Sequence, residues 1–78
     1  MVEKVNVREQ MNFTIDMLTA MVIEELAEDL KMEPSEILPD FCASKTGRGL
    51  YDESTKLWWN GPSYIADMYK LEIAARPH

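Results

Sequence analysis

The stretch from Asn12 to Lys31 constrains the fold most, because it runs for twenty residues without a glycine or a proline. Methionine, leucine, alanine and glutamate recur through it, and all four are good helix formers. In its second half the apolar residues are spaced i, i+1, i+4, i+5 and i+8 and share one helical face, while acids occupy the opposite arc. These apolar positions are Val22, Ile23, Leu26, Ala27 and Leu30. The pattern predicts one long amphipathic helix, preceded by a flexible or extended tail over residues 1–11.

Prolines and glycines divide the remainder of the chain into shorter segments. Pro34 suits the first position of a second helix. Pro39, in the middle of that helix, predicts a kink or a restart because proline lacks the N–H of the helical ladder. The glycine-rich stretch 44–49 predicts a turn in which Gly47 takes a left-handed conformation and ends the second helix. A third helix is expected over residues 50–58.

The segment Asn60-Gly61-Pro62 predicts a stop and a restart, with a positive φ at Gly61. A fourth helix is then expected from Pro62 to Ala75. Its apolar face is expected to hold Tyr64, Ile65, Met68 and Leu71, with Glu72 at its edge. The chain therefore predicts an all-α fold, with a single domain over residues 12–76. We expect the long helix and three shorter ones to form a small bundle with a helix-turn-helix-like centre.

Composition excludes several classes of protein. With 46% hydrophobic and 28% charged residues, the 78-residue chain has the composition of one folded domain rather than of a disordered segment. The longest apolar run without a charge, residues 18–23, is far shorter than the roughly 20 residues of a membrane-spanning helix. We therefore expect no membrane contact. A single cysteine, Cys42, cannot form an internal disulfide, which favours a cytoplasmic location.

Negative charge is concentrated in the first half of the chain. Residues 9–40 carry nine acids against one base, whereas residues 41–78 carry five bases against four acids. An acidic chain repels phosphate backbones unless it holds a local basic patch, which here would consist of Lys45, Arg48 and Lys56. Two functions for these bases remain open: an anion-binding turn, and a helix-turn-helix that binds nucleic acid. Because acids also stand near the start of the third helix, nucleic-acid binding is the alternative rather than the main expectation.

Residues able to carry catalysis or bind metal are scarce. His78, the one histidine, is the last residue, where nothing holds a general base in position. Cys42 falls on the predicted apolar face of the second helix and is expected to be a small buried hydrophobe. The acids of residues 24–29 form i, i+4 carboxylate pairs, but no histidine supports them, and a solvated acidic face is the better interpretation. We expect no catalytic residue, no metal and no cofactor.

Two apolar features instead indicate a binding surface. Phe13, Met17 and Met21 are spaced i, i+4 and i+8, on a stripe well round the first helix from its main apolar face. Trp58 and Trp59 are adjacent, so their side chains point about 100° apart and cannot both enter one small core. We expect Trp58 to pack inside, and Trp59 to be partly exposed and to serve binding. These features predict a protein partner, either a second copy or a foreign protein. Coverage of the stripe by the other helices is the alternative.

A short motif, L-x-x-x-G-x-x-Y-I, is formed by Leu57, Gly61, Tyr64 and Ile65. With it, the chain from Phe41 to Tyr69 resembles a small all-helical bacterial domain of unknown function. Some members of that family are encoded beside proteins similar to ADP-ribosyltransferase toxins, so the resemblance implies an accessory or antitoxin-like role. It implies no catalytic residues. The main expectation is therefore a non-enzymatic protein-protein interaction module.

Overall fold

The computed structural model describes the backbone of residues 7–77 and the side-chain surroundings of residues 13–77. This part of the chain is helical and contains no strand, which confirms the all-α fold class. The helices are α1 (Val7–Leu30), α2 (Pro34–Ala43), α3 (Lys45–Tyr51) and α4 (Pro62–Ala74), and two 3-10 turns, η1 (Glu53–Thr55) and η2 (Leu57–Trp59), connect α3 to α4. The first helix begins five positions before the predicted Asn12, so residues 7–11, predicted as tail, are helical.

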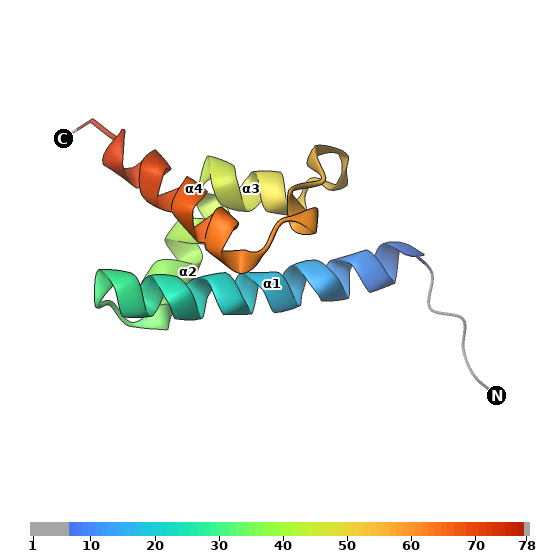
Figure 1. Cartoon of the computed structure of the whole chain (residues 1–78), viewed down its shortest axis with the longest axis horizontal. Coiled ribbons are helices and arrows are strands. Elements are labelled where there is room, and N and C mark those ends of the chain that lie inside the picture. Colours follow the sequence, from blue (N-terminus) through green and yellow to red (C-terminus); the bar gives the residue numbers. More distant parts are fainter. Residues whose placement is uncertain (1–6, 78) are drawn as a thin grey trace.

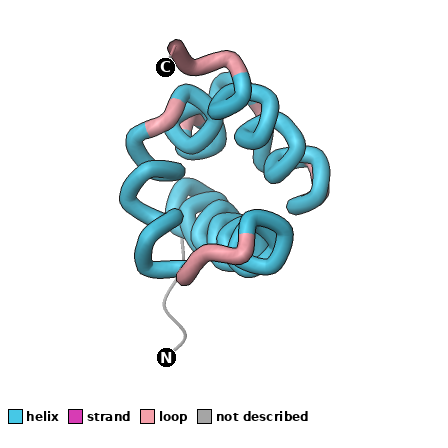
Figure 2. The backbone as a smooth tube through the Cα atoms, turned by 90° about the vertical axis from the view of Figure 1, so that its left-hand side faces the viewer, coloured by secondary structure: helices cyan, strands magenta, loops and turns pink. Residues whose placement is uncertain are grey.

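The other helices cover α1 from one side. In Figure 1, α1 runs along the lower edge of the molecule, and α3 and α4 lie above it. In the view along α1 in Figure 2, the remaining helices lie above α1 and beside it. The long helix packs against α2 and α4, and α3 packs against both of these. One side of α1 therefore has no neighbouring helix.

A single core joins all four helices. Its fully buried side chains are Ile15, Val22, Leu26, Ile37, Phe41, Leu50 and Ile65. Ala27 and Leu30 pack against this core, so the predicted apolar face of the first helix is confirmed. The rings of Phe41 and Tyr69 meet edge to face, with centroids 5.4 Å apart, and connect α2 to α4.

The connection from α2 to α3 differs from the prediction. Helix α2 continues through Pro39 without a restart, and Ser44 alone separates it from α3. Gly47 does not end a helix, because it lies inside α3 and no glycine among residues 7–77 has a positive φ. A glycine is needed there because α3 approaches the backbone of α2 closely, near the carbonyl of Phe41. The predicted helix over residues 50–58 is also wrong, since α3 ends at Tyr51 and 3-10 turns follow.

The turn before α4 also differs from the prediction. Gly61 has φ −72° and is extended, so the predicted positive φ is wrong. The left-handed residue is Lys56, with φ 55°, which joins the two 3-10 turns. Pro62 opens α4 as predicted. The buried face of α4 is rotated from the predicted one, because Ala66 and Tyr69 point into the core and leave the expected apolar positions Tyr64 and Leu71 exposed.

Candidate functional site

Three large apolar side chains stand exposed on α1. Phe13, Met17 and Met21, here named the outer stripe, are 67%, 53% and 48% exposed. At 100° per residue, they lie on the side of α1 opposite to the core residues Ile15 and Val22. The other helices do not cover them, so the alternative that the bundle buries this stripe is wrong.

Acids continue the outer stripe toward the end of α1. Glu24 and Glu28 fall on the same side of the helix as Met17 and Met21, and both are exposed. The free side of α1 is therefore apolar from Phe13 to Met21 and acidic at Glu24 and Glu28. A surface with these two parts matches a partner that offers apolar side chains beside basic ones.

The two tryptophans divide as predicted. Trp58 is partly buried against the core, and its Nε1 donates to the carbonyl of Glu53 at 3.5 Å. Trp59 is 69% exposed and meets the edge of the Trp58 ring with centroids 5.5 Å apart. Lys56 Nζ lies 5.4 Å from the centre of the Trp59 ring, in a cation–π arrangement. Trp59 is thus an exposed aromatic group on a turn that packs against α1.

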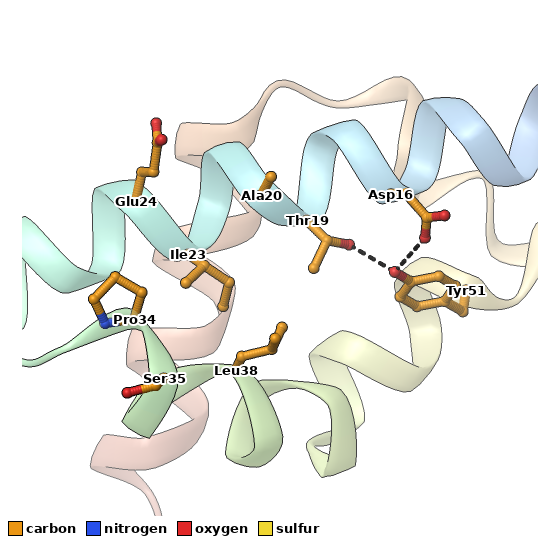
Figure 3. A pocket seen from close by; sticks show the side chains of 9 residues that line it. All are labelled: Asp16, Thr19, Ala20, Ile23, Glu24, Pro34, Ser35, Leu38 and Tyr51. Atoms are coloured by element: carbon orange, nitrogen blue, oxygen red, sulfur yellow. Dashed lines mark hydrogen bonds between the residues drawn. The ribbon is translucent and has the colours of Figure 1, made fainter.

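A groove of about 500 Å³ runs between α1 and α2. Figure 3 shows its apolar side chains, with Ile23 on α1 and Leu38 on α2 pointing toward each other and Tyr51 of α3 at one end. Leu38 and Tyr51 are 44% and 43% exposed. Asp16 stands beside Tyr51, and Glu24 lies at the rim near the other end, with its carboxylate pointing away from α2. The groove thus combines an apolar interior with two carboxylates.

Hydrogen bonds hold Tyr51 in place at the end of the groove. Its hydroxyl donates to Asp16 Oδ1 at 2.8 Å and lies 3.2 Å from Thr19 Oγ1, which also donates to the carbonyl of Ile15. Burial of the ring and the hydrogen bond to Asp16 raise the pKa of Tyr51, although the contact with Thr19 lowers it. The phenol therefore stays protonated and remains a donor to Asp16.

The three bases of the predicted phosphate-binding alternative do not surround a free anion site. Lys45 and Arg48 are exposed on α3, and Lys56 lies over Trp59. The N–H groups of Lys45 and Thr46, at the start of α3, both donate to the Glu72 carboxylate at 2.9 Å. Burial raises the pKa of Glu72, but these hydrogen bonds outweigh it and hold that pKa below its ordinary value. A carboxylate of α4 therefore occupies the position expected for an external anion.

The remaining polar clusters tie helices together. Asp40 of α2 accepts hydrogen bonds from the Tyr69 hydroxyl and, at 3.0 and 3.2 Å, from Arg76. The bond from Tyr69, and then that from Arg76, lower the pKa of Asp40. Burial and Asp40 together raise the pKa of Tyr69 to about 12. Lys70 of α4 pairs with Asp29 of α1. These contacts join α4 to its neighbours.

Residues able to support catalysis are not brought together. Cys42, predicted to be buried, is exposed, because α2 turns only Ile37 and Phe41 into the core. His78 lies outside the described residues. Within residues 7–77, no three His, Cys, Asp or Glu side chains gather in an arrangement suited to a metal ion. Nor does this part of the chain contain a helix with the length and apolar character needed to cross a membrane.

The sequence predicted the exposure of the outer stripe and of Trp59, but it did not predict the groove. The one signal for it was Leu38, since a short helix with apolar residues at 37, 38, 41 and 42 has a wider apolar face than one core can cover. Comparison with known proteins finds no matching family model, no similar curated protein and no similar solved structure. The resemblance to a small bacterial domain stays a prediction.

Proposed function

We propose that this chain is a non-enzymatic, cytoplasmic protein-binding module, acting as an accessory or antitoxin-like partner of another protein. One observation supports the proposal above all: Phe13, Met17 and Met21 are exposed together on the side of α1 that faces away from the core. Exposed clusters of large apolar side chains mark interaction sites. Methionine suits such a surface because its flexible thioether adapts to the shape of the partner.

A foreign protein is favoured over a second copy as the partner. The outer stripe continues into Glu24 and Glu28, and the chain carries a net charge of −6. A second copy would bring the same excess of acids to the contact, whereas a foreign protein with basic residues beside its apolar ones would complement it. The exposed Trp59 offers a further anchor of the kind enriched in interfaces.

Nucleic-acid binding through Lys45, Arg48 and Lys56 is the weaker alternative. The Glu72 carboxylate already occupies the N–H groups at the start of α3, where a phosphate would bind. Lys56 interacts with the Trp59 ring rather than with the other two bases. Salt dependence separates the two functions, because binding to phosphates weakens steeply with salt and an apolar contact does not.

Photocrosslinking in cells tests the proposal. A photoreactive amino acid at Met17 should form a discrete adduct, and the same group at Lys31, which is exposed beyond the end of α1, serves as the control. An adduct of twice the 9.0 kDa chain would indicate a second copy, and any other discrete mass would indicate a foreign protein. If the Met17 and Lys31 variants give the same products, the outer stripe is not an interface and the proposal fails.

A further inference from the structure

We propose that the groove between α1 and α2 accepts a basic amphipathic helix of the partner protein, with apolar side chains in the groove and basic side chains paired with Asp16 and Glu24. The inference rests on the proposed function and specifies the chemistry of the partner. Asp16, Ala20 and Glu24 lie along the edge of α1 that separates the groove from the outer stripe, so the two surfaces are continuous.

The groove has the size and lining of a binding site. Its volume of about 500 Å³ lies within the range usual for ligand pockets. Ile23 and Leu38 face each other across it, and the Tyr51 ring closes one end. An apolar side chain in the groove would cover the exposed 44% of Leu38. It would also cover much of the exposed part of the Tyr51 ring. Burial of these groups supplies the apolar part of the binding.

Charge determines which apolar segment fits. Among the residues that the structure describes, two carboxylates and no lysine or arginine line the groove. Asp16 accepts one hydrogen bond, from the Tyr51 hydroxyl through Oδ1, which leaves capacity on its oxygens for a cation. Among residues 13–77, the exposed Glu24 side chain has no ion-pair or hydrogen-bond partner. An acidic segment would be repelled at both ends, and a basic one would be held at both.

The spacing of the two acids favours a helical occupant. Residues 16 and 24 are eight apart on α1, which separates them by about 12 Å along the helix axis. On a partner helix aligned with α1, basic residues at i and i+7 span nearly the same length and share a face, with apolar residues at i+3 and i+4 between them. An extended strand is disfavoured because helices line the groove and offer no free sheet edge to pair with its backbone.

Binding of designed peptides tests the inference. The probe is a fluorescent alanine-based helical peptide with lysines at i and i+7 and leucines at i+3 and i+4. We expect it to bind the whole chain, and a peptide with glutamates in place of the lysines to bind at least about tenfold more weakly. Glu24→Gln should weaken binding about three- to fivefold. Glu36→Gln, exposed on α2 and outside both the groove and the outer stripe, is the matched control and should leave affinity unchanged.

Several outcomes would overturn the inference. Equal effects of Glu24→Gln and Glu36→Gln would show attraction to net charge rather than to the groove. If Leu38→Gln leaves the affinity for the peptide unchanged, the peptide binds outside the groove. If the chain dimerises and Leu38→Gln abolishes the dimer, the occupant of the groove is a second copy. Circular dichroism shows that each variant is folded. If photocrosslinking at Met17 gives a discrete adduct but the peptide does not bind, only the inference about the groove fails. If no discrete adduct forms at Met17, the proposed function fails as well.

Discussion

Replacement of Gly47 by alanine adds only one methyl group, yet we expect it to lower the free energy of unfolding strongly. A Cβ atom at this position would overlap the carbonyl oxygen of Phe41 and lie 2.8 Å from its carbonyl carbon and 3.2 Å from the Cα atom of Cys42. These are backbone atoms of α2, so no rotamer change relieves the overlap. The whole of α3 must move away from α2 instead.

The expected loss is about 3 kcal/mol. Overpacking of side chains costs about 1 to 3 kcal/mol, and an overlap with backbone falls at the upper end of that range or beyond it. Movement of α3 would also lengthen the hydrogen bond from the Gly47 N–H to Ser44 Oγ, which is 3.0 Å. Alanine recovers up to about 1 kcal/mol through its higher helix propensity. A chain of this size is stable by about 4 to 12 kcal/mol, so the loss is a large part of the total.

Urea unfolding followed by tryptophan fluorescence and circular dichroism measures the effect, with the other two glycines as controls. A Cβ at Gly49 would make an ordinary 3.7 Å contact with Leu57, and one at Gly61 would meet nothing within 4 Å. Both have ordinary backbone angles, so alanine should stabilise the protein at each by about 0.4 to 1 kcal/mol. If Gly47→Ala stays within about 0.5 kcal/mol of the unmodified protein, α3 does not approach α2 as described.

Three other changes give distinct expectations. Trp58→Ala should cost about 2 kcal/mol in urea unfolding because it packs against the core, whereas Trp59→Ala should cost under about 0.5 kcal/mol; the reverse order would contradict their burial. Glu72 has a lowered pKa in the folded state, so its contribution is present above its ordinary value of 4.5 and is lost as the pH falls below it. Glu72→Gln should therefore cost about 1 to 2 kcal/mol near pH 7 and reduce the loss of stability in acid; an unchanged pH profile would contradict this. Cys42 should react with a thiol reagent in the native protein about as fast as in urea, since it is exposed; protection would show that it is buried.

Local patterns were enough to predict most helices. The uninterrupted run that forms α1 and the prolines at the starts of α2 and α4 act within a few residues, so periodicity and proline geometry reveal them. Gly47 misled the prediction because a glycine that ends a helix and a glycine that permits close packing look alike in a sequence. The difference depends on Phe41 of another helix, which only the tertiary structure brings near.

The candidate site was predictable where a single helix forms it. Phe13, Met17 and Met21 share a side of α1 whatever the rest of the chain does, so their spacing was sufficient. The groove requires α1, α2 and α3 at once, and the contact of Tyr51 with Asp16 joins residues 35 positions apart. The contact of Glu72 with the start of α3 is equally remote in sequence. No local pattern encodes such pairs.

Ser44, the single residue between α2 and α3, limits which helices two copies of this chain can exchange by domain swapping. Its backbone N–H donates to the carbonyl of Phe41, and its side chain accepts from the N–H of Gly47. Two copies swap a helix only where the connecting segment straightens to reach the other copy. Straightening this one-residue joint would break both hydrogen bonds, so we expect α2 and α3 to move as one piece. Within residues 7–77, the segment 52–61 between α3 and α4 is the longest connection, and a swapped dimer would open there and exchange α4.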